Sequence, residues 1–259
     1  MSNQNVKELI QSIEWQDGKV FPIAEGPYRH RIVVHCSLRG RQKAMFANGE
    51  RPYFCYLELF SGNGQWIKEG AGIVPVLPDN RLLMVVEQRP AQGRYPDRPM
   101  IAKIGGKDVN LRTFGEHSSL EFPGGAIDPD EGLKAGFLRE LQEETGVQEQ
   151  SAVAYSFCRP TYPFGSDIAL RGCCHVVFLS GLSYQQHVAT DGGLNVLALT
   201  PDEVQLNIWM GTIHSVQAAL TAWSFYKEAD LARGAVLFRE RLLTLGYLKI
   251  EEIRIAKVK

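Results

Sequence analysis

The chain has 259 residues, which is enough for one large domain with a smaller attachment and for a sizeable hydrophobic core. Its formal net charge of −1 provides no excess of positive charge for nucleic acid or an anionic membrane, so we expect neither as a partner. It has no run of about 18 apolar residues and no apolar signal core, and its five cysteines lack disulfide-framework or zinc-site spacing. These features predict a reduced, cytoplasmic protein in which Cys174 and His175 are strand core.

Residues 1–65 are predicted to form a small, β-rich N-terminal extension. Residues 6–15 have the apolar periodicity of a short amphipathic helix, whereas residues 28–38 and 53–60 alternate as strands do. The Ser-Gly-Asn-Gly sequence at residues 61–64 is typical of a hairpin turn that leads into a partner strand. Such an extension needs a surface on which to pack, and we expect that surface to be the main domain or a second subunit.

The remaining chain, residues 66–259, is predicted to be the main domain. Short apolar runs between turn residues predict buried strands at residues 71–77, 81–87, 151–157, 173–179, 194–199 and 250–258. Helices are expected from residue 201 and over residues 213–225, and residues 91–120 are interpreted as an inserted lid or interface loop. Strands that alternate with helices indicate an α/β fold, an α/β/α sandwich with a mixed sheet.

The stretch from residue 125 to residue 147 holds the residues best suited to chemistry. Glu140, Glu143 and Glu144 are at positions i, i+3 and i+4, so a helix would place three carboxylates on one face. Like charges at this spacing repel by a few tenths of a kcal/mol, and no lysine lies on that face to offset the repulsion. A divalent cation would, and hard carboxylate oxygens suit Mg²⁺ or Mn²⁺.

The opposite side of this helix is predicted to pack against the rest of the domain. That side is formed by Ala135, Leu138, Leu141 and Thr145. Phe137 lies near Glu140 on a helical wheel, so we expect it to flank the acidic face rather than to belong to the core. Gly146 is expected to end the helix, because glycine adopts the left-handed conformation that closes a helix.

The residue pattern of this stretch resembles the signature of the Nudix hydrolase family. The pattern comprises Gly125, Glu131, Arg139-Glu140-Leu141, Glu143-Glu144 and Gly146-Val147. At ordinary residue frequencies, a chance match to all of it is on the order of one in ten million. The resemblance implies a Nudix-type sandwich that hydrolyses a pyrophosphate bond with Mg²⁺ or Mn²⁺. It also implies metal binding by Glu140, Glu144 and the Gly124 carbonyl, Glu143 as a further ligand or the base, and an Arg139–Glu131 pair as structural support.

Features outside the signature resemble the branch that acts on ADP-ribose and other nucleoside diphosphate sugars. Residues 87–89 resemble its EQ-x-R strand end, but the arginine follows the glutamine directly, without the intervening residue. Arg89 is therefore either a phosphate contact or part of a surface ion pair. Pro163, sixteen positions beyond the signature (163 − 147), fits a proline of that branch. With Arg89 and Pro163, Glu121 is assigned to substrate binding. Asp167 stands where the branch often has a glutamate, and we expect it to be a shorter substitute for a catalytic carboxylate.

The resemblance therefore predicts hydrolysis of ADP-ribose or a related nucleoside diphosphate sugar to a nucleoside monophosphate and a sugar phosphate. It also implies a homodimer in which the N-terminal strands contribute to the partner's site. Dinucleoside polyphosphates, NADH and nucleoside triphosphates remain alternative substrates. A non-catalytic, ligand-sensing module of the same fold is an alternative from another class, but such modules usually lose the carboxylates that this chain keeps.

Overall fold

The structure is a computed structural model of the whole chain. The residues described are 19–22, 29–35, 54–60, 65–88, 100–157, 162–163, 171–181, 195–213 and 240–256. The helix expected at residues 6–15, nearly all of the helix expected at residues 213–225, and the candidates Arg89 and Asp167 lie outside them. The chain forms two compact units, residues 1–68 with 164–170, and residues 69–163 with 171–259.

The first unit contains a four-stranded antiparallel sheet. Its strands pair in the order β1 (Lys19–Pro22), β2 (Arg29–His35), β3 (Phe54–Phe60) and β4 (Trp66–Ile67). The strands predicted at residues 28–38 and 53–60 are confirmed as β2 and β3. The short strands near the N-terminus therefore form a sheet separate from the sheet of the second unit.

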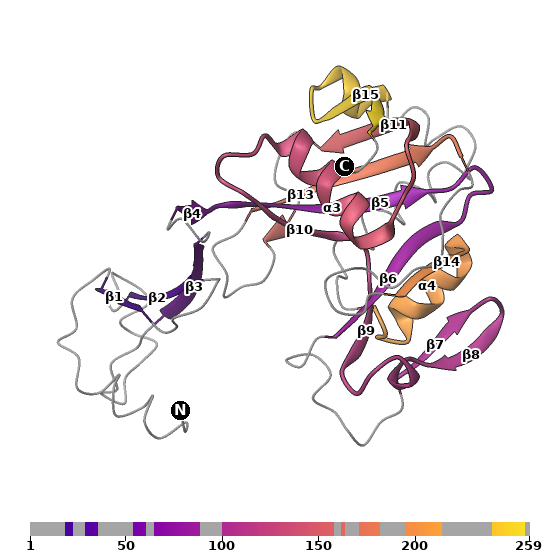
Figure 1. Ribbon diagram of the computed structural model, residues 1–259, viewed down its shortest axis with the longest axis horizontal. Coiled ribbons are helices and arrows are strands. Elements are labelled where there is room, and N and C mark those ends of the chain that lie inside the picture. Colours follow the sequence, from indigo (N-terminus) through magenta and orange to yellow (C-terminus); the bar gives the residue numbers. More distant parts are fainter. Residues whose placement is uncertain are drawn as a thin grey trace. The chain divides into compact units, whose positions relative to one another are not determined.

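The second unit is built on a nine-stranded mixed sheet (Figure 1). Its central path runs β14-β6-β5-β13-β11-β15, and β9, β10 and β12 pair with β6, β5 and β13. The strands are β5 (Glu69–Val76), β6 (Leu82–Gln88), β9 (Ser118–Glu121), β10 (Gly124–Ile127), β11 (Gln150–Phe157), β12 (Tyr162–Pro163), β13 (Arg171–Leu179), β14 (Asn195–Leu199) and β15 (Leu248–Ile255). The β5–β13 pair is parallel and the other pairs are antiparallel. This sheet confirms the predicted α/β class and mixed topology.

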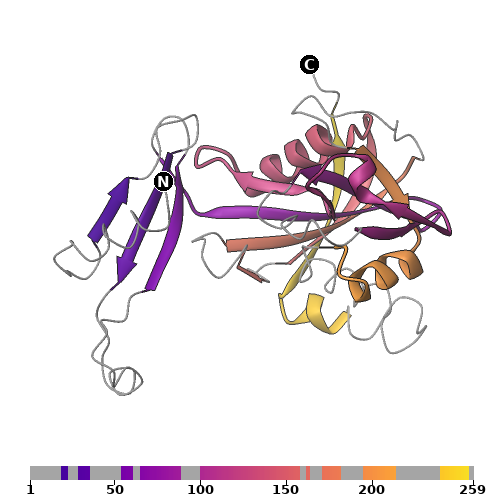
Figure 2. The same ribbon diagram turned by 90° about the horizontal axis from the view of Figure 1, so that it is seen from below.

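Helices α3 (Leu133–Thr145) and α4 (Pro201–Trp209) cover opposite faces of this sheet (Figure 2). Alternate side chains of β5 pack on the two faces of the sheet, because successive side chains along a strand point to opposite sides. Ile73 belongs to the cluster that contains Phe137 of α3, and Val74 belongs to the cluster that contains Val204 of α4. A strand buried on both faces has to be apolar throughout, which explains the continuous apolar runs in the sequence. Among the described residues, no helix has both the length and the apolar character needed to cross a bilayer.

Phe137 belongs to the core, and the expectation that it lies outside the core is wrong. Its side chain is buried, and its ring stacks on the imidazole of His175 in β13 with centroids 4.2 Å apart. Ala135, expected to pack, is exposed. The physical reason is that α3 lies with Phe137 and Glu140, one turn apart, directed toward the sheet. The acidic face and the packing face therefore meet along one side of the helix.

His175 is a buried histidine whose protonation opposes folding. Its Nδ1 lies 2.8 Å from the Ser156 hydroxyl, and its Nε2 is buried with no hydrogen-bond partner among the described residues. Burial lowers its pKa to about 4, against the opposite effect of Glu251. An unfolded chain, with a histidine pKa near 6.5, therefore takes up a proton between about pH 6.5 and pH 4 that the folded chain does not.

We expect this difference to reduce the free energy of unfolding by about 3 kcal/mol as the pH falls from 6.5 to 4, with no contribution above pH 6.5. Urea unfolding of the wild type and of His175→Asn at pH 8 and pH 4 measures it. The variant cannot titrate at this position, so it should lose less stability between the two pH values. An equal loss in both proteins would contradict the assignment.

The segment after residue 100 is a hairpin attached to α4. Strands β7 (Ile101–Ile104) and β8 (Lys107–Asn110) are joined by Gly105 and Gly106, both with left-handed φ (59° and 73°), and the short 3₁₀ helix Leu111–Thr113 follows. The Asn207 carboxamide accepts a hydrogen bond from the Lys103 N–H and donates one to the Lys103 carbonyl, both at 2.8 Å. Glu203, which also caps α4, accepts from the Gly106 N–H at 2.7 Å. This part of the predicted insertion is therefore hydrogen-bonded to α4.

Asn207→Ala is expected to lower the free energy of unfolding by about 2–4 kcal/mol. The substitution leaves the Lys103 N–H and carbonyl without their partner, and an unsatisfied buried polar group costs roughly 1–3 kcal/mol. The urea midpoint measures the loss. Asn110→Ala is the matched control, because the Asn110 side chain accepts one hydrogen bond from Arg112 in a half-buried position. Equal losses in the two variants would show that the Asn207 contacts do not hold the hairpin.

Candidate active site

The three carboxylates predicted on α3 lie on one side of that helix as expected. The helix ends at Gly146, whose φ of 63° is left-handed and whose N–H donates to the carbonyl of Gln142. Glu140 is buried, Glu144 is half-buried and Glu143 is exposed. The three carboxylates therefore differ in solvent exposure, from buried to exposed, within about one turn of the helix.

The glycines of β10 bring the main chain against this acidic face. A Cβ added to Gly125 would lie 2.6 Å from the Glu140 carboxylate, so a larger residue there would force that carboxylate to shift. A Cβ on Gly124 would lie 2.1 Å from the Ala71 carbonyl oxygen of β5. The Gly124 N–H donates to Oε2 of Glu144 at 2.7 Å. Strand β10 therefore positions two of the three carboxylates.

Arg139 contacts Glu140 and Glu143 as well as Glu131, its only predicted partner. Its Nε and Nη2 donate to the Glu131 carboxylate at 3.0–3.2 Å, and Nη2 also donates to the Ala126 carbonyl. Its Nη1 donates to Glu140 Oε1 at 2.8 Å and to Glu143 Oε2 at 2.9 Å. The predicted Arg139–Glu131 pair is present, but the carboxylates do not depend on a divalent cation alone for compensation, because Arg139 contacts two of them. The i, i+4 spacing of Arg139 and Glu143 was the signal that could have revealed it.

Burial and charge oppose each other at Glu140. Burial raises the pKa of its carboxyl group, and the charge and hydrogen bond of Arg139 lower the pKa without fully offsetting burial. Partial burial lowers the pKa of Arg139, but Glu131, Glu140 and Glu143 together raise it above its ordinary value. The charge on Glu140 is therefore maintained at an electrostatic cost, which a nearby cation reduces.

The donor atoms at this site suit a hard divalent ion. They are carboxylate oxygens on one helical turn beside a main chain that carries no side-chain obstruction at Gly125. Within the described ranges, however, no group of three or more His, Cys, Asp or Glu side chains is arranged to hold a metal. The hydrogen bonds explain this, because Glu140 and Glu143 bind Arg139 and Glu144 binds the Gly124 N–H. The residues fit such an ion once the carboxylates give up these hydrogen bonds.

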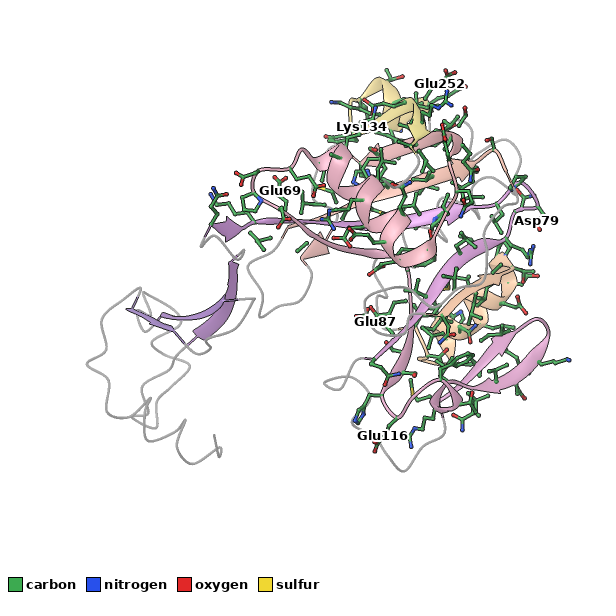
Figure 3. All side chains as sticks on the ribbon, viewed as in Figure 1. Glu69, Asp79, Glu87, Glu116, Lys134 and Glu252 are labelled. Carbon is green, nitrogen blue, oxygen red and sulfur yellow. The ribbon has the colours of Figure 1, made fainter. Side chains whose placement is uncertain are left out.

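A second acidic group lies on the same sheet face, on strands β6 and β9. Glu121 is 8% exposed and accepts a hydrogen bond from the Ser119 hydroxyl at 2.6 Å. Glu87, at the end of β6 (Figure 3), pairs across the ladder with Ser119, so Glu87, Ser119 and Glu121 share one face. The face is that of Val85, which packs with the α3 cluster. Ser119 had no signal in the sequence that would have singled it out.

The other predicted site residues are not brought to α3 by any described contact. Pro163 lies in β12, where its backbone pairs with Arg171. Gln88, beside the candidate Arg89, donates to the Ser118 hydroxyl and accepts from the His117 N–H, so it fixes the turn before β9. Arg89 and Asp167 lie outside the described residues, and their roles stay predictions.

Comparison with known proteins gives one family match. The family model described as NUDIX domain matches residues 67–214, which is more than half of the chain. Among solved structures, the crystal structure of DR0079 from Deinococcus radiodurans is 16% identical, covers 60% of this chain and 80% of its own, and superposes with a TM-score of 0.34. A superposition this weak adds nothing to the assignment. A comparison with curated proteins found no match.

Proposed function

This chain belongs to the NUDIX family, and from that membership we propose that it hydrolyses the pyrophosphate bond of a nucleoside diphosphate sugar, with ADP-ribose as the favoured substrate. The family consists of hydrolases of nucleoside diphosphate derivatives that generally use a divalent metal, typically Mg²⁺. The products would be a nucleoside monophosphate and a sugar phosphate. The observation that carries the proposal is that Glu140, Glu143 and Glu144 lie together on α3, with Glu140 and Glu144 against the glycines of β10.

The different solvent exposures of the three carboxylates support different roles for them in metal binding and proton transfer. Glu140 and Glu144, held against β10, would bind Mg²⁺ or Mn²⁺ together with the main chain at Gly124. When bound, the ion would neutralise the diphosphate and activate water. The Glu143 side chain is 44% exposed, against 12% for Glu140. Glu143 is therefore the carboxylate most open to solvent water, and it would be a further ligand or the base that accepts a proton.

The choice of substrate is supported by the sequence. Arg89 comes directly after the end of β6, which resembles the substrate-binding strand end of the nucleoside diphosphate sugar branch. Glu121 lies on β9, which pairs with β6. Pro163 fits a position of that branch. Asp167 would supply the additional carboxylate. We extend the proposal to a homodimer in which the N-terminal strands contribute to the partner's site. Light scattering of the full chain tests this part, and a monomer at working concentration would remove it.

A panel of nucleotides tests the proposed substrate. The full chain is incubated with ADP-ribose, UDP-glucose, diadenosine tetraphosphate, NADH and ATP, each with Mg²⁺ or Mn²⁺ and in matched samples with EDTA, and the products are identified by mass. We expect AMP and ribose 5-phosphate from ADP-ribose as the fastest reaction, and none in EDTA. Faster turnover of another compound would reassign the substrate within the family. Failure to hydrolyse any compound with either metal would favour the ligand-sensing alternative.

A further inference from the structure

The guanidinium group of Arg139 contacts Glu140, one of the two carboxylates proposed to bind the divalent ion, and Glu143, the proposed further ligand or base. We infer that Arg139 Nη1 and the metal exclude each other at Glu140 and Glu143, so that metal binding displaces this half of the guanidinium. The inference rests on the proposed metal-binding role of the α3 carboxylates and adds a conformational exchange to it. Arg139 would then act as the internal cation of the metal-free protein.

The guanidinium contacts divide into two sets. Nε and Nη2 are bound to Glu131 and to the Ala126 carbonyl, which belong to the segment before α3. Nη1 alone bridges Glu140 and Glu143. Because the two sets use different edges of a planar group, the bridging set can break while the anchoring set remains. Arg139 would then stay close enough to rebind when the metal leaves.

The packing around Glu140 explains why exchange is favoured over simple addition. Its carboxylate lies against Gly125 on one side and binds Arg139 through Oε1, and its side chain is only 12% exposed. Glu140 and Glu143 would hold an ion together only if it came close to the space that Nη1 occupies, because Nη1 lies 2.8 Å and 2.9 Å from their oxygens. Two cations on the same carboxylates would also repel each other strongly in this partly buried setting. The helical turn therefore keeps a positive partner in either state, and its carboxylates are not left to repel one another.

Arg139→Lys tests the exchange. Lysine keeps the positive charge but offers a single ammonium group, which cannot hold Glu131, Glu140 and Glu143 together as the guanidinium fork does. We expect calorimetric titration of the full chain to show Mn²⁺ binding at least about fivefold tighter in Arg139→Lys than in the wild type, the lower end of usual coupling between two sites. If Arg139 only supported the structure, its loss would loosen the site, and binding would be unchanged or weaker.

Arg254→Lys is the matched control, because Arg254 forms an exposed ion pair with Glu149 and should leave Mn²⁺ affinity unchanged. A measurement on the wild type serves if Arg139→Lys does not fold. Addition of Mg²⁺ should shift the Nη1 proton signals of Arg139 in its side-chain NMR spectrum and leave the Nε signal in place, whereas unchanged Nη1 signals at saturation would overturn the inference. Unchanged or weaker Mn²⁺ binding in Arg139→Lys would overturn this inference alone. A wild type that binds no metal would overturn the proposed function as well.

Discussion

Glu144→Gln is expected to reduce kcat by at least about 10²-fold while leaving the fold nearly intact. Glutamine has the shape of glutamate, and its Oε1 can still accept the hydrogen bond that the Gly124 N–H donates at 2.7 Å. It lacks the negative charge that would hold a divalent ion or take part in proton transfer, and the loss of one such group typically costs about 10²–10⁴ in rate. Turnover of ADP-ribose at saturating Mg²⁺ and thermal melting measure the two effects separately.

Glu149→Gln is the control for this experiment. Glu149 pairs with Arg254 on the exposed surface, and its loss should change kcat by less than about twofold. Near-wild-type turnover in Glu144→Gln would remove the acidic face of α3 from the mechanism. A large drop in melting temperature would instead show that the Glu144–Gly124 contact is chiefly structural.

Phe137→Ala is expected to lower the free energy of unfolding by about 3–5 kcal/mol, the usual cost of removing a buried aromatic side chain. The ring is buried and stacks on His175 of β13 with the ring centroids 4.2 Å apart. For a unit of this size, the loss corresponds to a fall in Tm of about 10 °C. Scanning calorimetry measures it directly.

Trp209→Ala is the matched aromatic control, because Trp209 on α4 is 80% exposed and its removal should change stability by about 0.5 kcal/mol or less. A Phe137 variant no less stable than the Trp209 variant would contradict the placement of Phe137 in the core. Because Glu140 lies one turn along the same helix, kcat should also fall in Phe137→Ala even at temperatures where the variant stays folded.

The strands and helix ends were predictable because their signals are local. Strands buried on both faces, such as β5 and β6, appear as continuous apolar runs, and glycine at position 146 closes α3 through its own backbone freedom. The start of α4 at residue 201 is likewise specified by its neighbours, since Thr200 and Glu203 form a reciprocal capping box. These elements depend on residues that are adjacent in sequence.

The errors concern contacts that local patterns do not contain. A helical wheel gives the angle between Phe137 and Glu140 but not the direction of the sheet, so it could not show that both are directed inward. No strand was predicted at Gly124–Ile127, because this strand forms by pairing with β5, a partner far away in the sequence. Arg139 reaches Glu140 and Glu143 because Glu131 and the Ala126 carbonyl, in the preceding segment, hold its other edge. The acidic composition of the site was predictable, whereas its internal cation required the three-dimensional structure.

Calorimetric titration of the purified full chain with Mg²⁺, with and without ADP-ribose, tests the central claim most directly. The wild type should take up the ion, and the double variant Glu140→Gln/Glu144→Gln should not, although both proteins melt cooperatively. Absence of uptake by the wild type under both conditions, or equal uptake by the double variant, would contradict a metal-dependent site on α3.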